Sequence, residues 1–128
     1  MQNESFVIVL PLPPAILNPN CAISSIGGRF AKAAASKKQR RLACEAVLEA
    51  NIMSIPWGRV KVRPVFACKT KRRRDTDNAI ASLKSAYDGI VDSGLIEDDT
   101  PEFMERAEPA FVVDREYPRL ELHIERIK

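Results

Sequence analysis

Two aspartates two positions apart, Asp75 and Asp77, are the residues of this 128-residue chain best suited to chemistry. In the extended segment expected before a helix, side chains at i and i+2 point the same way, so both carboxylates can face one cation. Hard carboxylate oxygens suit Mg²⁺ or Mn²⁺. A structural alternative is that Asp77 caps the helix and Asp75 pairs with a neighbouring arginine.

A run of basic side chains ends directly on this aspartate pair. Five cations occupy six positions: Lys69, Lys71, Arg72, Arg73 and Arg74. Because these cations repel one another, a free-standing structural role is not expected. Phosphate oxygens match guanidinium groups bidentately, so the run predicts contacts with a nucleic-acid backbone.

The charge of the chain is segregated at the same point. Residues 29–74 hold fourteen Lys and Arg against two acids, whereas residues 75–105 hold nine acids against one lysine. The formal net charge of +3 therefore conceals a basic half and an acidic half. Such a division fits a site that attracts a polyanion and holds a cation, although two differently charged solvent faces would give the same counts.

A helix is expected from about Asp77 to Ser93, ending at Gly94. At 100° per residue, Lys84 and Asp88 fall on the same face as Asp77. The lysine is then well placed to meet a phosphate, although an i,i+4 salt-bridge ladder explains the same spacing. Further acids, Asp98 and Asp99, follow the helix and can return to its start only after folding.

A second basic helix is expected to begin at Ser36, where Ser36-x-x-Gln39 reads as a capping box, and to end near Ala50. Positive charge in a first helical turn opposes the helix dipole, which is more typical of function than of fold. Long basic side chains that merely solvate a surface helix are the alternative. The basic residues of this turn, predicted to contact DNA, are Lys37, Lys38, Arg40 and Arg41.

The remaining chain predicts one α/β (α+β) domain over residues 1–128. Hydropathy patterns favour a mixed sheet of about four strands with two main helices packed on it. Pro64 argues that its strand lies at an edge or carries a bulge. The strands are expected at Ser5–Leu10, Arg59–Cys68, near Met104–Val113 and at Arg119–Ile127, and Pro11–Gly28 is expected to be a long loop.

Composition excludes several classes of protein. With 45% hydrophobic and 29% charged residues the chain is expected to be globular, and its three cysteines form neither a zinc finger nor a disulfide framework. No P-loop, G-x-G-x-x-G or Ser/His/Asp set is present, and the only histidine, His123, falls in a strand. A proline-interrupted N-terminal apolar run excludes a signal peptide, so a cytoplasmic protein without a membrane partner is expected.

The segment Lys71–Thr100 resembles the RusA family of Holliday-junction resolvases, particularly its phage and prophage members. The shared pattern is a basic run, D-x-D-N, a lysine-bearing helix ending in Asp-Gly-Ile, and an acidic D-D turn. The resemblance implies a RusA-like fold, with Asp75, Asp77 and Asp99 as catalytic metal ligands. It also implies that Lys84 is the essential helix lysine, although three more residues separate it from D-x-D-N than in the type enzyme. Asp98 could share the role of Asp99.

The function expected from these observations is Mg²⁺-dependent endodeoxyribonuclease activity, with Mn²⁺ as a substitute. The enzyme would resolve Holliday junctions and other branched DNA by paired phosphodiester hydrolysis, in recombination and repair. Its partners would be four-way DNA junctions and a second copy of the chain in a homodimer, with no small-molecule cofactor. A non-catalytic branched-DNA-binding module is the main alternative. An RNA-binding domain fits less well, because Phe30, Trp57 and Phe66 are the only aromatic residues in the basic half.

Overall fold

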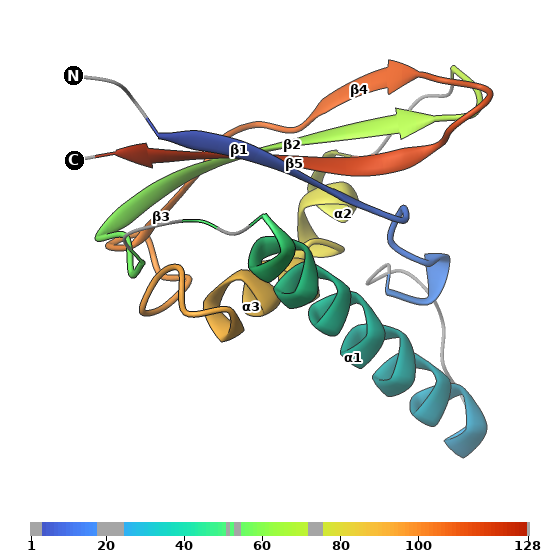
Figure 1. Cartoon of the computed structure of the whole chain (residues 1–128). Helices are drawn as coiled ribbons and strands as arrows, with labels where there is room; N and C mark the ends of the chain where they lie inside the picture. Colours follow the sequence, from blue (N-terminus) through green and yellow to red (C-terminus); the bar gives the residue numbers. More distant parts are fainter. Residues whose placement is uncertain (1–3, 18–24, 51, 53–54, 72–75, 128) are drawn as a thin grey trace.

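A five-stranded sheet with helices on one face forms the architecture (Figure 1). The computed structural model describes residues 4–17, 25–50, 52, 55–71 and 76–127. This α+β arrangement confirms the predicted mixed sheet with two main helices packed on it. The elements are β1 (Ser5–Leu10), η1 (Ala15–Leu17), α1 (Ile26–Glu49), β2 (Arg59–Cys68), α2 (Thr76–Ala81), α3 (Lys84–Asp92), β3 (Met104–Arg106), β4 (Ala110–Val113) and β5 (Arg119–Ile127).

The strand order is β1-β5-β2-β3, and β4 also pairs with β2. Strand β5 is antiparallel to both β1 and β2, whereas β3 and β4 are parallel to β2. A parallel pair needs a crossover, and the chain from β2 to β3 supplies it through α2 and α3. The crossover therefore carries the D-x-D-N motif, Lys84 and the acidic turn across one face of the sheet.

Alternating hydropathy explains the burial of the two central strands. Val60 and Val62 of β2 are fully buried beneath the helices, while Lys61 and Arg63, which alternate with them, are exposed. Strand β5 repeats this pattern, and its inward residues Leu120, Leu122 and Ile124 are buried. The core lies between these residues and the inward faces of α1 and α3, which include Ala43, Val47, Leu83, Tyr87 and Ile90.

The prediction that α1 begins at Ser36 is wrong. The helix begins at Ile26, and its N-cap is Ser25, whose hydroxyl accepts a hydrogen bond from the Gly28 amide at 3.0 Å. Ser36 instead contacts the Ser85 hydroxyl at 2.7 Å. The four basic residues 37, 38, 40 and 41 consequently lie in the middle of α1, where the argument from the helix dipole does not apply.

The expected helix from Asp77 to Ser93 is two helices. Helix α2 ends at Ala81 and α3 begins at Lys84, with Ser82 donating its hydroxyl to the Ala79 carbonyl at 2.7 Å. A serine that bonds to its own backbone competes with helix continuation. Asp77 therefore lies on α2 and Lys84 on α3, so the helical spacing used to align them does not apply across the break.

Pro64 lies on a central strand rather than at an edge. The backbone groups of Val60 and Val62 face β3, and the two-residue repeat puts the Pro64 nitrogen on the same side. On this side of β2, Pro64 lies opposite the segment between the end of β3 and the start of β4. The pairing register with β2 shifts by one residue from β3 to β4. The missing N–H thus coincides with a gap in the ladder.

A search of the described residues finds no helix with the length and hydropathy needed to cross a membrane.

Candidate active site

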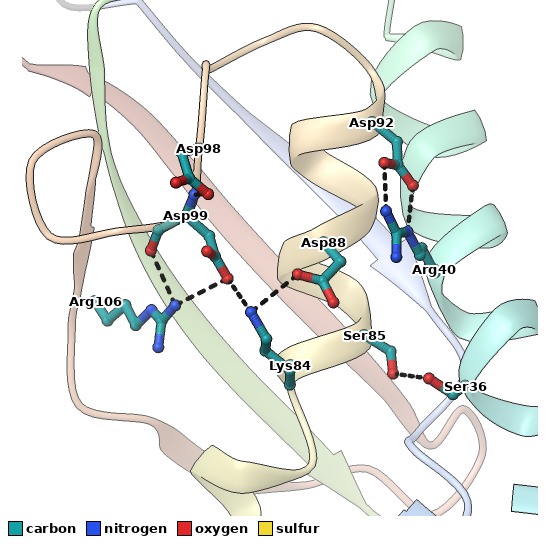
Figure 2. Close-up of polar contacts among 9 residues, drawn as sticks. All are labelled: Ser36, Arg40, Lys84, Ser85, Asp88, Asp92, Asp98, Asp99 and Arg106. Atoms are coloured by element: carbon teal, nitrogen blue, oxygen red, sulfur yellow. Dashed lines mark hydrogen bonds and ion pairs between the residues drawn. The ribbon is translucent and has the colours of Figure 1, made fainter. Parts of the chain in front are cut away.

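A lysine bridges two aspartates at the start of α3 (Figure 2). Lys84 Nζ lies 2.6 Å from Asp99 Oδ2 and 3.1 Å from Asp88 Oδ1. The contact with Asp88 is the i,i+4 pair that the helix spacing predicts. The contact with Asp99 is tertiary, because Asp99 lies fifteen residues along the chain, in the segment between α3 and β3.

The two partners of this tertiary ion pair differ in exposure. Asp99 is buried, with 9% relative exposure, whereas the side chain of Lys84 is 63% exposed. The hydrogen bond from Lys84 holds the pKa of Asp99 below its ordinary value, and Arg106 adds to this effect. Hydrogen bonds to Asp99 and Asp88 raise the pKa of Lys84. Both groups are therefore charged at neutral pH, and the cation remains open to solvent.

Arg106 of β3 is a member of the cluster that sequence reasoning missed. One terminal nitrogen of its guanidinium donates to the Asp99 carbonyl at 3.0 Å and lies 3.2 Å from Asp99 Oδ2. The guanidinium also sits over the Tyr87 ring, 4.8 Å from its centroid. The sequence signal for Arg106 is weak: it lies two residues after buried Met104 and so on the same side of β3, but its own side chain is 41% exposed.

Both cations that contact the Asp99 carboxylate reach the same oxygen. Among the residues that the structure describes, Lys84 and Arg106 both reach Oδ2 and no donor reaches Oδ1. The Asp99 amide is satisfied separately by Asp98 Oδ1 at 2.8 Å. Two fixed cations thus orient the carboxylate, and its second oxygen is left to accept another ligand.

A hollow of about 430 Å³ is lined in part by Asp99. It is lined by Arg59 at the start of β2 and by residues of the 99–106 segment, including Asp99 and Arg106. Both positive and negative side chains therefore border the same space. Such a mixed lining can receive a phosphate together with its counterion.

The D-x-D-N motif is only partly within the described residues. Asp77 is exposed in the first turn of α2, Asn78 is half-buried, and Asp75 lies outside the described residues. No group of three or more His, Cys, Asp or Glu side chains capable of holding a metal occurs in the described part of the chain. The predicted three-aspartate metal set thus remains a prediction, since one of its members is Asp75.

The predicted DNA-contacting residues fall into two groups. Lys69 and Lys71 are exposed after β2, and Arg72, Arg73 and Arg74 lie outside the described residues. On α1, Lys37 and Lys38 are exposed, Arg41 lies 3.6 Å from Glu45, and Arg40 is bound to Asp92 of α3 by two hydrogen bonds. Arg40 therefore has a structural partner, whereas no ion pair of Lys37 or Lys38 occurs within the described part of the chain.

No protein-family model matches the chain, and no curated protein matches it significantly.

Proposed function

We propose that the protein is a Mg²⁺-dependent endodeoxyribonuclease that cuts four-way DNA junctions by phosphodiester hydrolysis, as the likeness of residues 71–100 to the RusA family implies. The observation that carries the proposal is the contact between the side chains of Asp99 and Lys84. Two residues of the motif, fifteen positions apart, meet at 2.6 Å, and one of them, Asp99, also lines an open hollow. This contact supports reading the motif as one site rather than as two unrelated charge clusters.

Each residue of the proposed site has a distinct role. Lys84 is a charged and largely exposed ammonium group, suited to neutralising the scissile phosphate as negative charge develops on it. Arg106 holds Asp99 in place through the contacts at Oδ2. The basic run from Lys69 to Arg74 would position the DNA backbone without reading its sequence.

The metal ligands of the proposal are Asp75, Asp77 and Asp99. Their chemistry fits Mg²⁺, which prefers carboxylate oxygens, and Asp99 Oδ1 has no donor among the described residues. The ion would supply Lewis-acid stabilisation of the phosphoryl oxygens. Paired cuts across a symmetric junction require two sites, so we propose a two-fold homodimer as the active form.

The test is a cleavage assay on a synthetic four-way junction and on linear duplex of the same sequence, each with Mg²⁺, with Mn²⁺ and with EDTA. We expect metal-dependent cleavage of the junction and little of the duplex. Asp75→Asn and Asp99→Asn should each abolish cleavage while junction binding persists, because loss of a carboxylate lowers repulsion of the phosphates. Equal cutting of both substrates would leave a nuclease but remove the junction specificity.

Asp92→Asn is the matched control. Asp92 is an exposed acid of the same crossover, but its partner is Arg40 on α1. Cleavage at neutral pH should be unchanged in this variant. Binding of the junction by the wild-type protein without cleavage in either metal would instead favour the non-catalytic DNA-binding module.

A further inference from the structure

Helix α1 is much longer than its contact with the rest of the protein. Its buried residues, Gln39, Ala43 and Val47, all lie in the C-terminal part. None of residues 26–34 is buried, and this end of the helix extends away from the sheet (Figure 1). We call residues 26–35 the α1 arm.

The arm is helical without being packed into the core. Its sequence includes Ala31, Ala33, Ala34 and Ala35, and alanine has the highest helix propensity. Ser25 provides the N-cap. The helix at this position presents side chains at a distance from the body, which core packing does not require.

The side chains that the arm and its continuation present are basic. Residues 26–44 contain six Lys and Arg and no acid. Within the described residues, no ion pair is found for Arg29, Lys32, Lys37 or Lys38, whereas Arg40 is paired with Asp92. A stretch of helix that carries several cations and no acid complements a polyanion.

An exposed aromatic ring stands among these cations. Phe30 is 72% exposed, whereas the two other aromatic residues of the basic half, Trp57 and Phe66, are buried in the core. Lys37 and Arg41 follow Phe30 by seven and eleven residues, which puts them within about 20° of its direction on the helix. One outward face of α1 therefore carries an aromatic ring followed by two cations.

Helix α1 is fixed relative to the candidate active site by a contact with α3. Ser36, the first residue after the arm, contacts Ser85 at 2.7 Å, and Ser85 directly follows Lys84 (Figure 2). Lys84 and Ser85 point in opposite directions from α3, one towards Asp99 and the other towards α1. The arm therefore leaves the body on the α1 side of α3, and the Lys84–Asp99 pair lies on the other side of this helix (Figure 2).

We propose that the α1 arm is a branch-point-sensing surface, in which Phe30 stacks on a base exposed where DNA strands separate and the cations of α1 bind the flanking phosphates. This inference rests on the proposed action on branched DNA. Bases at a branch point lose stacking partners, and an aromatic ring can replace one of them. In uninterrupted duplex the bases are stacked, so Phe30 has no base to contact.

The first test measures binding without divalent metal, so that cleavage plays no part. Phe30→Ala should weaken binding to a four-way junction roughly tenfold, as expected for loss of one base–aromatic stack, and change binding to linear duplex less than about twofold. Phe30→Tyr should restore junction binding. Leu48→Ala is the matched control, because Leu48 is an exposed apolar residue at the other end of α1.

A fluorescent base at the branch point reports stacking directly. With 2-aminopurine in this position, wild-type protein and Phe30→Ala should give different fluorescence at saturating protein, and Phe30→Tyr should follow the wild type. The Lys37→Gln, Lys38→Gln double variant should reduce the slope of log affinity against log salt by about two.

Two results would overturn the inference. One is equal junction affinity of Phe30→Ala and wild type. The other is a loss of dimer in sedimentation that accounts for the whole effect, which would assign the arm to a second copy of the chain. A different result would contradict only the nuclease proposal. In that case the wild-type protein binds the junction in a Phe30-dependent way but shows no metal-dependent cleavage.

Discussion

The two ends of α1 have the same secondary structure and opposite relations to the fold. The C-terminal part, residues 36–49, crosses α3 so closely that Gly89 allows no side chain between them. The α1 arm has glycine too, but a Cβ added at Gly27 meets nothing within 4 Å. The same residue type is thus required by packing in one place and merely tolerated in the other.

This difference indicates that one part of the helix stabilises the fold and that the other part is available for binding. The packed part is held by Ala43 and Val47 in the core, by the Ser36–Ser85 contact and by the ion pair between Arg40 and Asp92. None of residues 26–34 is buried, so the arm contributes little to the core, and its exposed ring and cations are accessible to a partner. Substitutions should therefore affect folding at one end and DNA binding at the other.

The largest expected effect is that of Gly89→Ala. The new methyl group would press on the Arg40 carbonyl oxygen and lie 2.7 Å from the Ala43 Cβ, forcing α1 and α3 apart. We expect a loss of about 3 kcal/mol in the free energy of unfolding, measured with urea. Gly27→Ala should instead be neutral or stabilise by about 0.5 kcal/mol, because it only improves helix propensity. Similar losses in both variants would contradict the comparison.

Val47→Ala should have the next largest effect. Val47 is 3% exposed, and removing two methyl groups from the core leaves a cavity, so we expect a loss of about 2 kcal/mol. Leu48→Ala, one residue further, removes an apolar side chain that is 56% exposed and should change stability by less than about 0.5 kcal/mol. Urea unfolding of both variants measures the contrast within a single turn of helix.

Substitutions of two serines, Ser25 before the arm and Ser36 in the packed part, allow the same comparison with smaller expected effects. Ser36→Ala removes the contact with Ser85 and should lower the free energy of unfolding by about 1 kcal/mol. Ser25→Ala removes the N-cap and should fray the arm, which reduces helical circular dichroism with little change in global unfolding. An equal effect of both changes on urea unfolding would show that the arm is part of the cooperative unit.

The smallest expected effect is a dependence on pH. Arg40 holds the pKa of Asp92 below its ordinary value, so this pair stabilises the fold above about pH 4, the range in which an unfolded aspartate is ionised. The stabilisation should disappear as the pH falls through the lowered pKa. The difference in unfolding free energy between wild type and Asp92→Asn should therefore be constant from pH 5 to 7 and shrink below pH 4. A difference that grows in acid would contradict this sign.

Periodic features were predictable from the sequence and tertiary ones were not. Alternating residues in β2 and β5 identified their buried faces, because a strand repeats every two residues. The start of α1 was placed ten residues late, because Gly27 and Gly28 favour a loop and Ser36 with Gln39 imitates a capping box. The alanines that follow the glycines supply the propensity that outweighs them.

In the candidate site, too, local contacts were predictable from the sequence and tertiary contacts were not. Lys84 and Asp88 could be paired from their helical spacing, and their 3.1 Å contact confirms that pair. The meeting of Lys84 with Asp99 depends on how the chain turns after α3, and no local rule fixes that turn. Arg106 arrives from β3, a three-residue strand whose position beside β2 is set by the crossover. Its contact with Asp99 is therefore a property of the assembled fold.

The gap opposite Pro64 has a consequence for how the edge of the sheet moves. Strands β3 and β4 pair with β2 in registers that differ by one residue, so the ladder does not join them into one cooperative strand. Amide protons of β4 can then exchange with solvent through local openings that leave β3 and its Arg106 in place. The interruption would thus insulate the candidate site from fluctuations at the far end of its own sheet edge.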